Sequence, residues 1–328
     1  MNNSSSGEAL RQPEFDKNRV NLNLNFGAHV TTKDFEGLEK ELRRGGYDIY
    51  VPELVGRRTA DEDLFRKIAR GDTKTYQRLM ADIAIKGMRN SVYAAQFGAM
   101  FGTHLNLFFA DVVDTQVKED PELGEFGIPV SGTTFTGFED YLEACRQRTL
   151  LGARLLQKRD PIIAGNIDVG LVPFIEQHPK LSQMDEVKVL VTMGDMHSFL
   201  LPGLLEARGF DPKVTGKPEV KDLTAGEEAE VRILVGEELD ERLLVETAAN
   251  GVLWGHLYHP YTMQKRKIVR QLTGVLSRDV TEALFENYRR YSSVWVHKFT
   301  EGWMAKLGIA VPELRLIDPN QDHHLLGK

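Results

Sequence analysis

The feature that most constrains the fold is a strand–helix–strand unit within residues 20–52. Residues 20–26 (VNLNLNF) alternate apolar and polar side chains, which is typical of a β-strand. Apolar residues at helical spacing follow over 35–42, and 48–52 (DIYVP) is a second short apolar run. Two strands joined by a helix within about thirty residues pair in parallel. We therefore predict an α/β fold with a central, mostly parallel sheet flanked by helices.

A second unit of the same kind begins at 187–193 (VKVLVTM), a short β-branched run bounded by turn residues. It leads into Gly194-Asp195-Met196-His197, and a leucine-rich helix is expected from about Ser198 to Gly209. The first unit has the same order of strand, glycine-containing turn, histidine and helix, with His29 at the equivalent place. Ligands bind at the carboxyl ends of parallel strands. We expect His29, Glu53 and His197, which all follow strands, to lie at that edge.

The remaining chain is expected to be mostly helical, and a single domain over 19–328 follows a disordered tail over 1–18. A buried helix is expected over 92–113, and Pro161 is expected to separate two helices. The C-terminal portion, about 240–328, is predicted to be largely helical. The segments that we interpret individually are helices over 61–118, 137–158, 160–178 and 278–307, a loop over 121–137, and a strand over 231–235.

Composition limits the classes of function. The chain of 328 residues has 41 basic and 48 acidic side chains, a net charge of −7, and its basic residues are scattered. This argues against a nucleic-acid partner. The sequence has no run of about 20 apolar residues, so we expect no membrane span. The polar start has no apolar core of a secretory signal. With Cys145 as the one cysteine, interpreted as a buried thiol, we expect a cytoplasmic protein.

Two imidazoles and a carboxylate at one sheet edge are a ligand set found in some catalytic zinc sites, and neutral imidazole can also take a proton from water. Other interpretations remain open. His29 and His197 could be turn histidines bonded to backbone, and Glu53 could be a surface carboxylate. Arg159-Asp160, before Pro161, could simply begin a helix. His104 is interpreted as a core histidine, and the apolar stripe of 278–307 as core or as an interface of a homo-oligomer.

Four short motifs in order resemble the TraB/TIKI group, which includes the related erythromycin esterase-like and ChaN-like proteins. The likeness covers about 20–210 and consists of two Gly-x-x-His turns, a strand ending in Glu-Leu with an arginine beyond it, and an Arg-Asp pair. The first motif departs from the family, because Phe26 stands where the family has glycine. The motifs are Phe26-Gly27-Ala28-His29, Glu53-Leu54-Val55-Gly56-Arg57-Arg58, Arg159-Asp160 and Gly194-Asp195-Met196-His197.

The resemblance implies a hydrolase of a peptide or a small-molecule ester, with a divalent metal such as Mn, Co or Zn as a candidate cofactor. In the TIKI branch it implies a metal-dependent peptidase, and in the erythromycin esterase-like branch a histidine and a glutamate that activate water. Carried to this chain, His29, His197 and Glu53 bind a metal or activate water, with Glu53 as ligand or general base. Arg58 or Arg159 steadies negative charge, and Asp160 orients a partner. The alternative is a non-catalytic protein that sequesters a peptide or small molecule in the same pocket.

Overall fold

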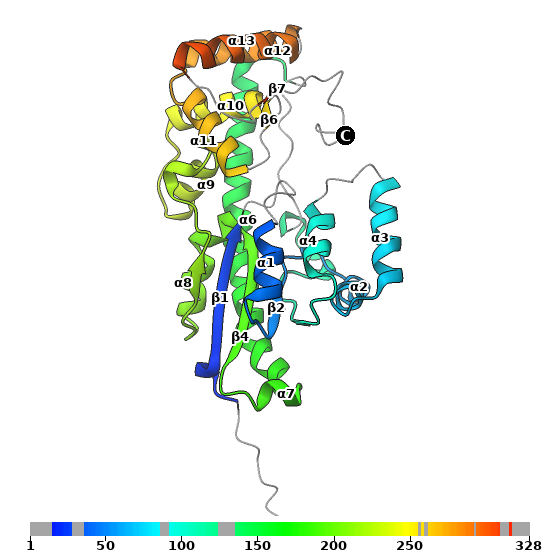
Figure 1. The fold of residues 1–328 in the computed structure, drawn as a ribbon. Helices are drawn as coiled ribbons and strands as arrows, with labels where there is room; N and C mark the ends of the chain where they lie inside the picture. The colour runs from blue at the N-terminus through cyan, green and yellow to red at the C-terminus, as the bar shows by residue number, and fades with distance from the viewer. Residues whose placement is uncertain are drawn as a thin grey trace, which may run out of the picture.

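A five-stranded parallel sheet with the strand order β3-β2-β4-β1-β5 forms the centre of the computed structural model (Figure 1). The structure describes residues 15–27, 36–85, 92–123, 135–254, 257–258, 262–291, 293–308 and 315–316. The predicted α/β class is confirmed. The strands of the sheet are β1 Val20–Gly27, β2 Ile49–Val51, β3 Asn106–Leu107, β4 Val187–Gly194 and β5 Lys213–Thr215.

The long central strands β1 and β4 pair along their whole length, from Val20 opposite Val187 to Gly27 opposite Gly194. On the other side of β4, Val51 of β2 lies opposite Val191. All pairs in this sheet are parallel, so the carboxyl ends of β1, β2 and β4 lie at one edge. The segments that follow β2 and β4 therefore meet there, as the sequence predicts.

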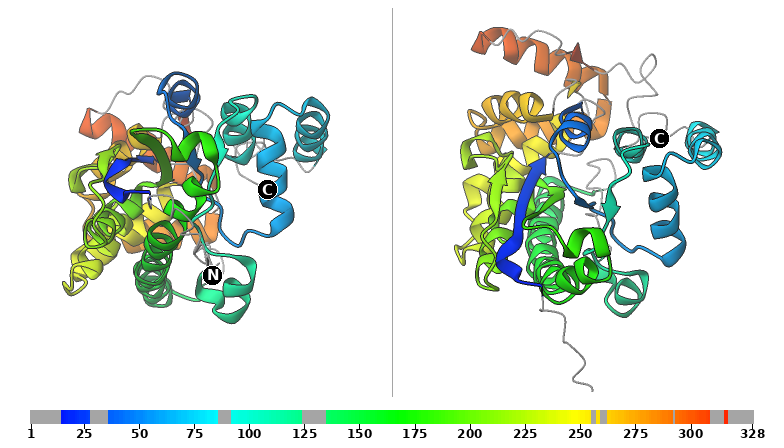
Figure 2. Two further views of the ribbon diagram at one scale, coloured as in Figure 1. Left: turned by 90° about the horizontal axis from the view of Figure 1, so that it is seen from below. Right: turned by 60° about the horizontal axis from the view of Figure 1, so that its bottom comes forward.

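Helices cover both faces of the sheet (Figure 2). On one face the apolar side chains of β1 and β4 pack against α6 and α8, and on the other face Tyr50 and Leu190 pack against α1, α2 and α4. The helices are α1 Glu36–Arg44, α2 Thr59–Ala69, α3 Thr73–Ile85, α4 Val92–Met100, α5 Asp114–Glu119, α6 Phe138–Glu176, α7 Pro179–Ser182, α8 Leu201–Glu206, α9 Ala225–Leu234, α10 Glu241–Trp254, α11 Thr262–Thr273, α12 Arg278–Tyr291 and α13 Ser293–Leu307.

Helix α6 joins the sheet to the C-terminal helices, and its 39 residues extend about 58 Å. Its second half packs on the sheet through residues such as Ile163 and Ile167. Its first half, including Tyr141 and Cys145, lies in a separate helical core. The prediction of two helices separated at Pro161 is wrong: the proline lies inside α6, where burial of the surrounding turns outweighs the lost backbone hydrogen bond.

The C-terminal part is helical, as predicted, and stands at the carboxyl edge of the sheet (Figure 1). The expected helix over 278–307 is instead two, α12 and α13, whose apolar faces contribute to one core. The expected strand over 231–235 is wrong, because a Thr224–Glu227 capping box starts α9 and its apolar face is buried. A short antiparallel pair, β6 Leu257–Tyr258 and β7 Arg315–Leu316, completes this part.

Three further expectations are corrected. The expected helix over 92–113 ends at Met100, because Gly102 and His104 have positive φ, and β3 follows. His104 is exposed rather than in the core. Of the expected disordered tail over 1–18, residues 1–14 lie outside the described residues, whereas Phe15 is buried and a 3₁₀ turn, Lys17–Arg19, leads into β1.

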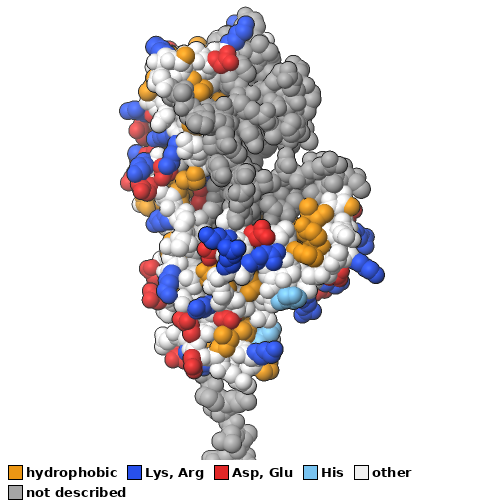
Figure 3. Space-filling view, viewed as in Figure 1, with side chains coloured by type: hydrophobic (Ala, Val, Ile, Leu, Met, Phe, Trp, Pro, Cys, Tyr) orange, Lys and Arg blue, Asp and Glu red, His pale blue; other side chains and the backbone are white. Residues whose placement is uncertain are grey.

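The surface carries charge of both signs, and no described helix is long and apolar enough to cross a membrane. On the face seen in Figure 3, lysine and arginine side chains lie among aspartate and glutamate side chains. Ion pairs between helix neighbours, such as Arg43 with Glu39 and Lys118 with Asp114, account for part of this pattern.

Candidate functional site

Glu53 occupies the carboxyl edge of the sheet, two residues beyond the end of β2. Its Oε2 accepts a 2.7 Å hydrogen bond from the backbone N–H of Gly194, the last residue of β4. Its Oε1 accepts a 2.8 Å hydrogen bond from Nη2 of Arg159. The Glu53 side chain is 21% exposed. The backbone at the end of β4 thus holds the Glu53 carboxylate, which follows the neighbouring strand β2. This carboxylate still reaches solvent.

His197 lies in the 3₁₀ turn Asp195–Phe199, which directly follows β4, and it is buried. Nδ1 of the ring is hydrogen-bonded to Oδ1 of Asp160. Nε2 points to the other side and lies 3.6 Å from Oε1 of Glu53. The imidazole is therefore held between two carboxylates, one from α6 and one from the β2 end. The predicted meeting of Glu53 and His197 is confirmed.

Arg159 and Asp160 come from the middle of α6, where the helix passes the sheet edge. Arg159 is buried, and its guanidinium donates to Asp111 through Nε at 2.9 Å and Nη2 at 2.5 Å, in addition to Glu53. Asp111 itself accepts from the backbone N–H groups of Leu54 and Val112. The guanidinium thus bridges two carboxylates and helps to fix the position of the Glu53 side chain.

Asp111 is a member of the cluster that the sequence interpretation missed. It follows β3, the strand adjacent to β2, and its side chain is 1% exposed. The signal was an aspartate inside the apolar run Phe108-Phe109-Ala110-Asp111-Val112-Val113, since buried charges occur almost only when paired. Because we expected a helix over 92–113, the sequence interpretation did not recognise Asp111 as a residue that follows a strand.

The charges of the cluster favour a protonated His197. Burial alone lowers the pKa of the imidazole, but the Asp160 carboxylate and then the Glu53 carboxylate outweigh it and raise the pKa from 6.5 to about 9. Burial also lowers the pKa of Arg159, and Asp111 and Glu53 reverse this and raise it. At neutral pH the cluster then contains three carboxylates and two cations. A histidine in this state is a proton donor, whereas the sequence interpretation considered a neutral imidazole that takes a proton from water.

Of the predicted site residues, Arg58 does not join this cluster. Arg58 is the residue before α2, its side chain is 67% exposed, and it pairs with Asp61 of the same turn. His29 lies outside the described residues. The described part of β1 ends at Gly27, next to Gly194.

The described residues do not by themselves fit a metal ion. Nδ1 of His197 is bound to Asp160, and both oxygens of Glu53 already accept hydrogen bonds. With these atoms engaged, the described residues offer fewer than the three protein ligands of a typical catalytic zinc site. No three His, Cys, Asp or Glu side chains within the described ranges are arranged to hold a metal. The metal site that includes His29 stays a prediction.

A second charged group connects this edge to the C-terminal helices and was also missed from the sequence. Asp195, two residues before His197, pairs with Arg266 of α11, and Arg266 also pairs with Glu227 of α9. All three side chains are largely buried. The 3₁₀ turn that carries His197 is therefore held on one side by α6 and on the other by the helical part.

Comparison of the chain with models of protein families, with curated proteins and with solved structures gives no match in any of the three.

Proposed function

We propose that this protein is a hydrolase that cleaves a peptide or ester bond with Glu53 and His197. The observation that carries the proposal is the pairing of a solvent-reaching carboxylate with a buried imidazolium whose Nε2 lies 3.6 Å away. Environments that set two titratable groups to opposite protonation states at one pH are typical of acid–base catalysis. The resemblance of the four motifs to the TraB/TIKI group supports the same class.

The roles follow from exposure and hydrogen bonding. Glu53 is the member of the cluster that reaches solvent, so it takes the proton from a water that attacks the carbonyl carbon. His197 supplies a proton from Nε2 to the leaving group, and Asp160 on Nδ1 holds the ring in place. Arg159 is a positioning residue, because it is buried and bound to Asp111 and Glu53. No step in this scheme uses a metal.

The geometry also favours a second candidate, a binding protein without turnover. Both oxygens of Glu53 already accept hydrogen bonds from Gly194 and Arg159, so the carboxylate is partly neutralised before any substrate arrives. A carboxylate stabilised in this way is a weaker base. Such a protein would bind a peptide or small ester at the same edge and release it unchanged.

Hydrolysis of a panel of p-nitrophenyl esters and fluorogenic peptides separates the two candidates. A Glu53→Gln variant is expected to lose about 10²- to 10⁴-fold in kcat/KM, the usual contribution of general base catalysis. Glu206→Gln is the matched control, since Glu206 is an exposed glutamate of α8. Hydrolysis that survives in Glu53→Gln would remove Glu53 from the mechanism, and binding without turnover in wild type would favour the second candidate.

The predicted metal is tested by elemental analysis of purified wild type beside His29→Ala and His197→Ala. A stoichiometric divalent ion lost in both variants would place a metal at this edge. An ion retained in both variants would exclude these histidines as its ligands.

A further inference from the structure

A cavity of about 270 Å³ lies in the helical part, between α6, α9 and α10. At about 30 Å³ per water molecule it has room for on the order of nine waters. A ligand with roughly the same number of heavy atoms would therefore fit. Its α6 lining ends at Thr149, which lies ten residues or about 15 Å along the helix from Arg159. The cavity is thus distinct from the cluster at the sheet edge.

The polar atoms that line this cavity are rich in acceptors. The hydroxyls of Tyr141, Thr149 and Thr247 donate to backbone carbonyls of their own or a neighbouring helix, so each presents only lone pairs. Oδ1 of Asn250 is buried and has no hydrogen-bond partner among the described residues. A buried acceptor without a partner has a free energy cost, which a donor group on a ligand would remove.

Among the described residues, no cation is bound to one carboxylate on the wall. Glu230 of α9 forms no hydrogen bond or ion pair within the described part of the chain, whereas its neighbour Glu227 is bound by Arg266 and by Thr224. Burial, followed by the nearby charge of Glu227, raises the pKa of Glu230 to about 8. The site therefore holds a carboxyl group whose charged form lacks a partner that a ligand cation would supply.

A guanidinium at the edge of the cavity likewise has no ion-pair partner among the described residues. Arg148 of α6 lines the cavity, is exposed, and makes no ion pair with any described residue. Arg148 and Glu230 line the same cavity without an ion pair within 4 Å, and the charge of Arg148 lowers the pKa of the Glu230 carboxyl. The cavity is thus lined by a buried carboxyl group, which a cationic ligand would ionise, and by an exposed guanidinium.

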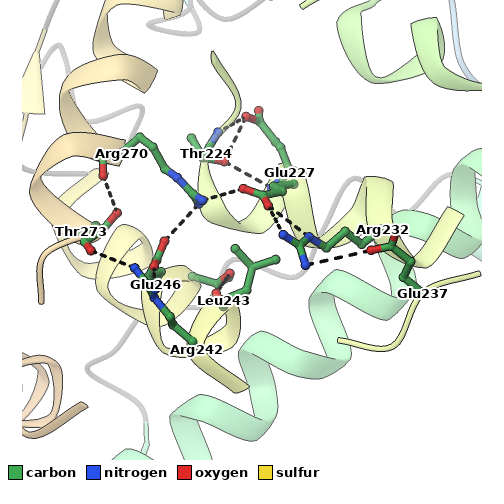
Figure 4. Close-up of polar contacts among 12 residues, drawn as sticks. Thr224, Glu227, Arg232, Glu237, Arg242, Leu243, Glu246, Arg270 and Thr273 are labelled. Carbon is green, nitrogen blue, oxygen red and sulfur yellow. Dashed lines mark hydrogen bonds and ion pairs between the residues drawn. The ribbon is translucent and has the colours of Figure 1, made fainter. Parts of the chain in front are cut away.

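The walls are braced, so that this arrangement exists before a ligand arrives. Figure 4 shows the ion pairs that tie α9 to its neighbours. Glu228 of α9 pairs with Arg270 of α11, and Arg270 pairs with Glu246 of α10. A preformed site lowers the cost of ordering side chains on binding.

We propose that this cavity binds a small zwitterion of amino-acid size, with its ammonium group at Glu230 and Asn250 and its carboxylate at Arg148. An ammonium offers three donors to an acceptor-rich wall. A carboxylate suits the fork of donors on arginine. An amine without a carboxylate would satisfy Glu230 but leave Arg148 unpaired, so it is the weaker ligand. The site is independent of the proposed hydrolase chemistry.

Binding of individual L-α-amino acids to the full chain, followed by thermal shift and calorimetry, tests the proposal. At least one amino acid should raise Tm and bind at one site per chain. Its N-acetyl derivative and its decarboxylated amine should each bind about 10- to 100-fold more weakly, since a hydrogen bond to a charged group contributes about 1.5–3 kcal/mol. No binding by any amino acid at millimolar concentration, or equal binding of the decarboxylated amine, would overturn the proposal.

Variants of the two charged groups locate the site. Glu230→Gln and Arg148→Gln should each weaken the amino acid by about 10- to 100-fold. Glu237→Gln, an exposed glutamate just beyond the end of α9, should leave it unchanged. Arg148 is exposed, so its replacement keeps the test decisive even if Glu230→Gln does not fold. Unchanged affinity in Arg148→Gln, or in a folded Glu230→Gln, would show that the amino acid binds elsewhere.

Discussion

Asp160→Asn is expected to lower the pKa of His197 and to remove pH-dependent stability from the protein. Burial opposes the charged imidazole, and Asp160 is the largest influence that raises its pKa, from 6.5 to about 9. This difference corresponds to about 3 kcal/mol of tighter proton binding in the folded state. The substitution keeps the size of the side chain and removes its charge.

The sign of the effect follows from linkage. Because the folded pKa of His197 is raised, its contribution to the free energy of unfolding is complete below pH 6.5 and is lost as pH rises through about 9. Asp160→Asn should therefore cost most below pH 6.5 and least above about pH 9. The difference between the two limits should approach 3 kcal/mol, with a smaller remainder from the altered hydrogen bond.

Urea unfolding of wild type and Asp160→Asn at about pH 6 and about pH 9.5 measures this difference, and NMR titration of the imidazoles measures the pKa itself. His197→Gln assigns the resonance. Asp211→Asn, an exposed aspartate, is the control. A wild-type His197 that titrates near 6.5, or an Asp160→Asn cost that is the same at both pH values, would refute the reasoning.

Three other predictions concern stability. Arg159→Met leaves two carboxylates without their cation and should lower the free energy of unfolding by about 3–5 kcal/mol in urea denaturation; a cost below about 1 kcal/mol would contradict the network. Gly216→Ala places a methyl group 1.9 Å from the carbonyl oxygen of Phe26, at a positive φ of 73°, so it should cost about 1–3 kcal/mol and lower Tm. In the wild type, the Glu230 carboxyl has a folded pKa raised to about 8, so it destabilises the protein as pH rises from 4.5 through 8. Glu230→Gln removes this carboxyl, so the Tm of the variant relative to wild type should rise over that range. A constant difference in Tm would argue against a buried carboxyl.

The central sheet could be predicted because local sequence patterns indicated its longest strands. Alternation in β1 and the β-branched run of β4 marked both strands, and the ends of β2 and β4 placed Glu53 and His197 at one edge. The short strands β3 and β5 were missed, since two or three residues have no periodicity to detect. Their strand geometry depends on pairing with β2 and β1, which only the folded chain supplies.

The ion network of the site was only partly visible in the sequence. Arg159 and Asp160 were recognised through a motif, but their partners Asp111, Glu53 and His197 are 37 to 106 residues away along the chain. The expected helix boundary at Pro161 also hid that α6 continues past the sheet edge. Asp195 and Arg266 were missed for the same reason, because a pair separated by 71 residues has no local signal.

The dependence of kcat/KM on pH, measured on any ester or peptide that the wild type hydrolyses, tests most directly whether Glu53 and His197 work as base and acid. With His197 as the proton donor, kcat/KM should be level near neutral pH and fall with an apparent pKa near 9, and the fall should move to lower pH in Asp160→Asn. A rate that instead rises through pH 6.5 to 9 as His197 loses its proton would contradict this assignment.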